Sequence, residues 1–205
     1  IPSRSYVTDV VASKHDVNAI YVTFNYHKYG DYKPYIYKTE NYGKTWKLIT
    51  TGIGNEDFTR VLRADPKRKG LLYAGTEKGM YISFNNGKNW SKFQLNLPIV
   101  PITDLAIKDD NLIAATQGRS FWMIDDLTPI HQLTKNTVKE KVTLFNPKAS
   151  YQLSGGNGRT SKTQGTNHPG GVAVYFNVNK FTNKDTVTMS FYDTSKKLIQ
   201  KFSNH

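Results

Sequence analysis

Three tyrosines recur at every third position within residues 25–34, as Tyr26, Tyr29 and Tyr32. The same stretch carries His, Lys and Asp side chains and contains a glycine and a proline, so it is expected to form a loop. Aromatic rings on a loop could stack against sugar rings while the polar neighbours hydrogen-bond to hydroxyl groups. Alternatively, the tyrosines pack the loop onto the rest of the protein. We therefore take the three tyrosines as candidate ligand contacts and leave both interpretations open.

Two charged residues in other short polar stretches are further candidates. Glu77 lies in residues 76–78 and Arg119 in residues 117–119. A guanidinium group can hold a carboxylate or sulfate through two parallel hydrogen bonds, so Arg119 is suited to an acidic ligand. It is equally suited to pairing with an acid of a neighbouring structural unit. We include both residues among the candidate ligand-binding positions.

Hydrolysis of a glycosidic bond would need two carboxylates about 5–10 Å apart. Asp9 and Asp104 lie in predicted strands but belong to no motif. Asp125 and Asp126 are adjacent, and neighbours on a strand point to opposite faces, so we interpret this pair as part of a turn. The catalytic residues, if there are any, therefore stay unknown.

Composition and net charge limit the kinds of ligand or partner that the chain is expected to bind. The chain has 205 residues and a net charge of +12, which favours anionic partners such as acidic glycans or simply gives a basic surface. The charge is +6 up to residue 143 and +6 beyond it, so no basic arm stands out and nucleic acid is an unlikely partner. There is no cysteine, the five histidines are scattered, and no apolar run is long enough to cross a membrane. We expect neither a metal nor a cofactor.

An eight-residue pattern occurs twice, 44 residues apart, and must shape the elements around these candidates. Both copies read hydroxyl, any, Asn, any, Gly, Lys, any, Trp. Asn and Gly tolerate left-handed turns, the hydroxyl ties off loop amides, and the Trp anchors the turn in apolar packing. The pattern residues are Thr39, Asn41, Gly43 and Trp46 in the first copy and Ser83, Asn85, Gly87 and Trp90 in the second.

Short strands rich in β-branched and aromatic residues surround this pattern in three successive units. Each unit has two strands joined by a polar turn, a third strand containing Tyr37, Tyr81 or Trp122, and a fourth predicted strand. In the third unit the fourth strand is expected at residues 130–133. A period of about 40–45 residues with four strands per unit is typical of β-propeller blades. The sequence therefore predicts an all-β fold with three blades in residues 1–134; because propellers need four to eight blades, we expect the others to precede Ile1.

The composition changes after Leu133, and residues 135–205 form a second predicted region. A Gly-, Ser- and Thr-rich stretch at residues 155–167 is expected to be a flexible loop. Strands are predicted at residues 172–178, 186–193 and 197–202, the last two as a hairpin that turns at residues 193–196. These strands are typical of the start of an immunoglobulin-like β-sandwich.

The repeated pattern resembles the Asp-box, or bacterial neuraminidase repeat, of sialidases, sortilin-type receptors and several glycoside hydrolases, with Asn in place of the usual Asp. The stretch from Ala115 to Pro129, followed by residues 169–172 and the hairpin, is similar to the C-terminal part of large secreted bacterial proteins with such repeats. The resemblance implies that the repeated pattern is a structural turn, and that loops between second and third strands open on the ligand face. Arg60, Arg63 and Arg119 do not reproduce the three-arginine pattern of sialidases.

The resemblance and the residues together predict a binding scaffold that presents propeller loops to a protein or glycan. The alternative is a glycoside hydrolase of the Asp-box propeller type whose carboxylates lie mostly on blades outside this chain. Because the chain begins at Ile1 without a leader, we expect a segment of a larger exported protein whose signal lies elsewhere.

Overall fold

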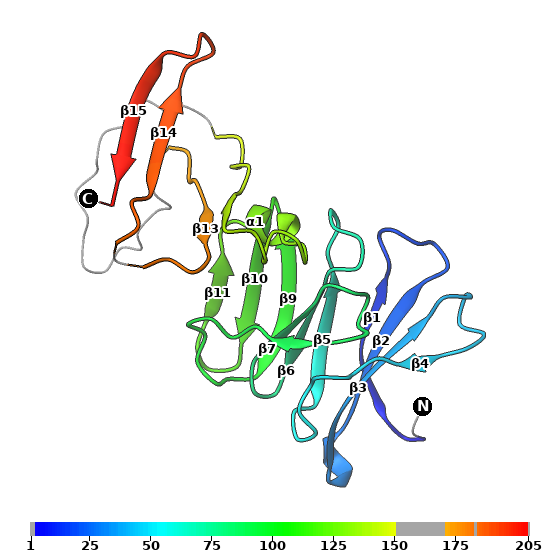
Figure 1. Cartoon of the computed structure of the whole chain (residues 1–205). Coiled ribbons are helices and arrows are strands. Elements are labelled where there is room, and N and C mark those ends of the chain that lie inside the picture. Colours follow the sequence, from blue (N-terminus) through cyan, green and yellow to red (C-terminus); the bar gives the residue numbers. More distant parts are fainter. Residues whose placement is uncertain (1–2, 151–170, 183, 205) are drawn as a thin grey trace.

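The computed structural model describes residues 3–150, 171–182 and 184–204. Three consecutive antiparallel sheets lie side by side along the molecule, and the C-terminal strands extend beyond the third sheet (Figure 1). The elements outside these sheets are short, so the all-β fold class is confirmed. Within the described residues no helix is long and apolar enough to span a membrane.

The first two sheets each have four strands in the order in which they occur along the chain. The first contains β1 (Tyr6–Ala12), β2 (Ile20–Tyr26), β3 (Asp31–Thr39) and β4 (Lys47–Leu48), with a short 3-10 helix, η1 (His27–Tyr29), between β2 and β3. The second contains β5 (Thr59–Ala64), β6 (Leu72–Thr76), β7 (Met80–Ser83) and β8 (Ser91–Lys92). This up-and-down order is that of propeller-type blades.

The third sheet differs from its prediction. It contains only β9 (Ile102–Lys108), β10 (Asn111–Thr116) and β11 (Phe121–Ile124), and a short helix, α1 (Thr128–Gln132), occupies the place of the fourth strand expected at residues 130–133. Asp126 Oδ1 accepts the Thr128 N–H at 2.8 Å, and Pro129 follows, which favours the first turn of a helix and cannot donate a ladder hydrogen bond. The prediction of three four-stranded blades is therefore wrong for the third unit.

Apolar side chains join neighbouring sheets into one body. One buried cluster contains Tyr21 and Ile36 of the first sheet and Leu62 and Tyr81 of the second. A second cluster joins the second and third sheets. The first strands β1, β5 and β9 are neighbours across these junctions, so each sheet uses the next to bury its apolar face.

The two copies of the repeated pattern form the same turn after β3 and β7. Thr39 Oγ1 and Ser83 Oγ each accept the N–H of the glycine four residues later at 2.9 Å. The Asn side chain of each copy likewise accepts the backbone N–H four residues after it at 2.9 Å. Gly43 and Gly87 have φ angles of 84° and 80°, which explains why glycine stands there.

Residues beyond α1 form two small sheets. β12 (Val142–Leu144) pairs with β13 (Phe176–Val178), and β14 (Thr188–Tyr192) pairs with β15 (Leu198–Ser203). The predicted hairpin turn is present, because Asp193 and Lys196–Lys197 exchange backbone hydrogen bonds. The described strands do not form a closed sandwich, so the immunoglobulin-like fold and the domain boundary near residue 134 stay predictions. The loop predicted at residues 155–167 lies outside the described residues.

Candidate functional site

The tyrosine-rich loop forms one end of the first sheet, where β2 turns through η1 into β3 (Figure 1). Gly30 ends η1 in the left-handed region, with φ of 79°, and its N–H donates to the His27 carbonyl at 3.0 Å. Asp31 then accepts the Tyr35 hydroxyl at 2.6 Å and the Lys33 N–H at 3.0 Å. The hydrogen bond from Tyr35 lowers the pKa of Asp31, and the same bond raises the pKa of Tyr35 to about 12. These local bonds fix the loop that carries the tyrosines.

The aromatic rings of this loop gather with a ring from the second unit. Tyr26 and Tyr29 stack with centroids 4.6 Å apart, and His27 stacks on Phe58 at 4.7 Å. Tyr32 lies 6.3 Å from Phe58 in a tilted arrangement. Tyr29 and Tyr32 remain 54% and 51% exposed, so the rings pack and also present a surface to solvent. The tyrosines therefore pack onto the protein, and their contact with a ligand stays a prediction.

Phe58 connects these rings to Glu77. The Arg60 guanidinium lies over the Phe58 ring at 5.2 Å, and its Nε donates to Glu77 Oε2 at 2.6 Å. A second guanidinium nitrogen is also 2.6 Å from Glu77 Oε2. Glu77 is therefore held in place by Arg60. We call the group Tyr26, His27, Tyr29, Tyr32, Phe58, Arg60 and Glu77 the tyrosine platform.

Sequence reasoning missed Phe58 and the role of Arg60, because both come from the strand start of the next unit. Thr59 positions Phe58 and Arg60, because its Oγ1 donates to the Phe24 and Tyr35 carbonyls. These hydrogen bonds connect the start of β5 to the ends of β2 and β3 that flank the loop. The sequence signal that could have identified Phe58 was an aromatic residue directly before the first strand of the second unit.

Arg119 lies at the same end of the molecule but apart from the platform. The end of β6 packs against the start of β9, because a Cβ atom built on Gly75 would lie 2.7 Å from Ile102 Cγ2. Ile102 in turn pairs with Thr116, and the turn that contains Arg119 follows directly. Arg119 uses its backbone in that turn, donating to Thr116 Oγ1 and accepting from Trp122 Nε1. Its exposed guanidinium makes no ion pair with any described residue, so the predicted partner acid in a neighbouring unit is not found there.

The two carboxylates considered for hydrolysis share one arginine. Arg63 on β5 lies 2.5 Å from Asp9 on β1 and 2.6 Å from Asp104 on β9. Asp9 also accepts the Leu62 N–H at 3.0 Å. The three side chains thus form a chain of ion pairs across the first strands of the three units.

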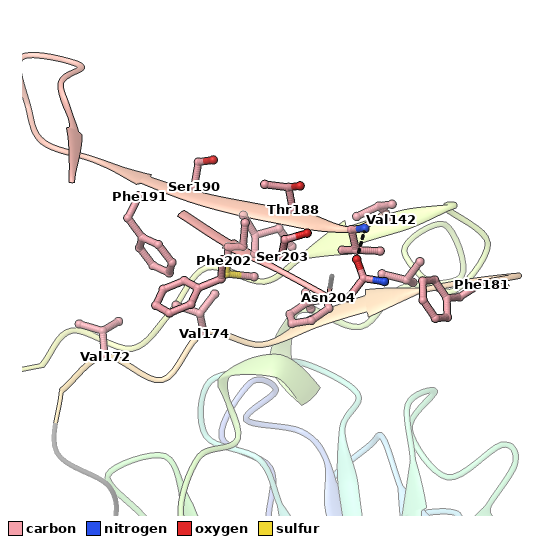
Figure 2. Close-up of a pocket in the computed structure, with 15 residues that line it drawn as sticks. Val142, Val172, Val174, Phe181, Thr188, Ser190, Phe191, Phe202, Ser203 and Asn204 are labelled. Atoms are coloured by element: carbon pink, nitrogen blue, oxygen red, sulfur yellow. Dashed lines mark hydrogen bonds between the residues drawn. The ribbon is translucent and has the colours of Figure 1, made fainter. Parts of the chain in front are cut away.

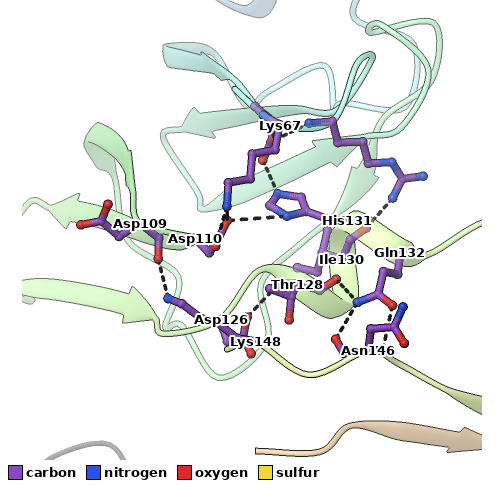
Figure 3. A network of polar contacts seen from close by, with 12 residues as sticks. Lys67, Asp109, Asp110, Asp126, Thr128, Ile130, His131, Gln132, Asn146 and Lys148 are labelled. Carbon is purple, nitrogen blue, oxygen red and sulfur yellow. Dashed lines mark hydrogen bonds and ion pairs between the residues drawn. The ribbon is translucent and has the colours of Figure 1, made fainter. Parts of the chain in front are cut away.

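A second polar network holds α1 against the second unit (Figure 3). His131 Nε2 lies 2.9 Å from Asp65 Oδ2, and Asp65 is fully buried and also accepts the N–H groups of Lys67 and Arg68 at 2.8 Å. Lys67 Nζ lies 2.7 Å from Asp110, whose backbone carbonyl accepts from Leu127. Among the described side chains no group of three His, Cys, Asp or Glu is placed to hold a metal ion. The network positions α1 against the second unit.

No protein-family model and no curated protein matches the chain. Among solved structures it is similar to an ancestral GH74 enzyme, with 25% identity over 55% of this chain and 14% of that one, and a TM-score of 0.44. It is also similar to the GH74 xyloglucanase from Xanthomonas campestris, with 10% identity over 56% and 20% of the two chains and a TM-score of 0.44. A third similarity, to YCF48 bound to D1 peptide, has 18% identity over 60% and 38% of the chains and a TM-score of 0.44. The chain thus spans well under half the length of each of these three proteins. By its own strand order it is an all-β protein built from propeller-type blades.

Proposed function

We propose that this chain is a recognition scaffold of a larger exported protein, which presents the tyrosine platform and Arg119 to a protein or glycan ligand. The observation that carries the proposal is that Tyr29 and Tyr32 are half-exposed, while Tyr29 stacks on Tyr26 and Tyr32 lies against Phe58. Rigid aromatic rings give large contact area at little cost in conformational entropy. The scaffold beneath them is the part of an Asp-box propeller that the repeated turns predict.

Each member of the site has a distinct proposed role. The exposed faces of Tyr29 and Tyr32 supply apolar contact with a sugar ring or an apolar side chain. Glu77, oriented by Arg60, accepts hydrogen bonds from ligand hydroxyl or amide groups. Arg119, at the same end of the molecule, is placed to pair with an acidic group of the ligand.

The alternative, glycoside hydrolysis, is less well supported by the carboxylates of the described residues. Hydrolysis needs two carboxylates that are both free to contact the substrate. Asp9 and Asp104 instead pair with Arg63, and Glu77 pairs with Arg60. Hydrolysis by this protein would therefore require acids from outside these three sheets.

The test is an array of neutral, acidic and sulfated oligosaccharides together with an array of peptides, probed with the complete protein. Each bound glycan is then assayed for release of reducing sugar. Binding without release is the expected result. Release from a bound glycan would establish the hydrolase instead, and failure to bind any member of either array would contradict the scaffold.

A further inference from the structure

A large apolar groove separates the two small C-terminal sheets. Its volume is about 820 Å³, and its walls include Val142 and Phe176 from one sheet and Met189, Phe191 and Phe202 from the other. Figure 2 shows Phe191 and Phe202 pointing from the hairpin toward Val174 on the opposite wall. The groove is independent of the tyrosine platform, which belongs to the first two units.

The sheets on either side of this groove are too small to be stable on their own apolar faces. Each has two strands among the described residues, and two-stranded sheets are marginal in water unless a third strand or a packed layer covers them. Leu144, Phe176 and Phe202 are 64%, 51% and 57% exposed. Exposed apolar area of this kind marks an interaction surface.

The charge of the C-terminal region indicates which kind of partner would cover the groove, since Lys141 and Lys201 directly neighbour the wall residues Val142 and Phe202. Described residues from position 135 onward carry nine lysines against three acids. Two of those acids hydrogen-bond within local turns: Asp185 accepts from Thr182, and Asp193 accepts from Ser195 and Lys197. These hydrogen bonds lower the pKa of both carboxyl groups. No ion pair within 4.0 Å joins two described residues of this region, so close ion pairs do not neutralise the excess of lysine.

We propose that the groove docks an extended segment of a partner protein in which apolar residues alternate with carboxylates. Successive side chains of a strand point to opposite sides, so such a segment would place its apolar residues in the groove and its acids outward toward the lysines. Its backbone would add to a sheet edge, the mode of recognition known as β-augmentation. A second copy of this chain is a poor occupant because it would bring the same excess of lysine.

The direct test uses a fluorescent peptide of alternating Val and Glu, titrated into the complete chain and followed by anisotropy. Two controls have matched length: a peptide with the same residues in blocks, and one with Lys in place of Glu. We expect the alternating Val–Glu peptide to bind at least about tenfold more tightly than either control, and to bind more weakly at high salt. Equal binding of a control peptide would overturn the proposal.

Two variants locate the binding. The double variant Lys141→Glu/Lys201→Glu changes two exposed side chains that neighbour the wall residues Val142 and Phe202, and should weaken binding of the Val–Glu peptide by about tenfold or more. Hydrogen exchange with bound peptide should slow at backbone amides of β13 to β15. Unchanged affinity of the variant, or exchange that slows only elsewhere, would contradict the proposal, and a stable dimer that excludes the peptide would replace it with self-association. Tyr29→Ala/Tyr32→Ala should bind the peptide normally, which separates this surface from the proposed scaffold function.

Discussion

The two tryptophans of the repeated turns occupy different environments although their sequence context is the same. Trp90 is 4% exposed, and its Nε1 donates to the Ile49 carbonyl of the preceding unit at 2.7 Å. Trp46 is only partly buried. Equivalent residues of a repeat therefore contribute differently to stability, depending on the residues that surround them.

Trp90→Ala should cost roughly 3–5 kcal/mol of unfolding free energy, since it leaves a cavity and an unpaired carbonyl. Trp46→Ala should cost about 1 kcal/mol, in line with partial burial. Urea denaturation of both variants measures the difference. Equal losses for the two variants would show that the turn itself, and not the junction between units, carries the energy.

Buried Tyr21 makes stability sensitive to alkaline pH. Burial chiefly raises its pKa to about 12, with the nearby Glu40 and Asp16 adding to the effect, whereas the unfolded chain has a tyrosine pKa of about 10. The folded state thus favours the neutral phenol, and this contribution is complete below pH ~10 and lost as pH rises toward ~12.

We expect Tyr21→Phe to shift alkaline unfolding to higher pH, because it removes this ionisation. The exposed Tyr42→Phe is the matched control and should unfold like the original protein. Circular dichroism across the alkaline range follows the transition. An unchanged midpoint in Tyr21→Phe would mean that other groups govern alkaline unfolding.

At the scale of elements, the third unit shows how a local signal overrides a repeat. The strand period predicted a fourth strand at residues 130–133, yet Asp126 and Pro129 start a helix there. Leu127 is fully buried, and His131 reaches the buried Asp65 of the second unit. The sequence could show the polar turn, but it could not show that a carboxylate 66 residues away would receive the helix.

His131→Ala should lower unfolding free energy by about 1.5–3 kcal/mol, the range for a hydrogen bond to a charged group. Asp65 would keep its two backbone donors, so the loss stays below that of an unpaired buried charge. Gln132→Ala on the same helix is the control, because its side chain bonds only to partly exposed groups, and should cost less than about 1 kcal/mol. Thermal unfolding of both variants provides the comparison, and equal stability of the two would rule out the buried pair as the anchor of α1.

At the scale of the whole molecule, the sequence predicted structure formed by residues close together in the chain and missed the contacts between units. Strand positions, the hairpin and the bonds within the repeated turns follow from residue types within a few positions. The sharing of Arg63 by Asp9 and Asp104, and the contact of Phe58 with His27 and Tyr32, depend on how one sheet packs on the next. No single-unit pattern encodes those distances, so the sequence could name the candidate acids but not their arginine partners.

The loop and the first repeated turn lie at opposite ends of β3, which gives the binding proposal its own control. Tyr29 lies before this strand and Tyr32 lies near its start, whereas Tyr42 follows the strand and is 69% exposed. All three side chains are accessible, and removing them should leave the fold intact.

The most direct measurement is binding of Tyr29→Ala/Tyr32→Ala and of Tyr42→Ala to the oligosaccharide and peptide arrays, compared with the original protein. We expect the double variant to lose about tenfold or more in affinity for the bound members, and Tyr42→Ala to bind normally. Full binding by the double variant, or an equal loss in Tyr42→Ala, would contradict the claim that the tyrosine platform is the recognition site.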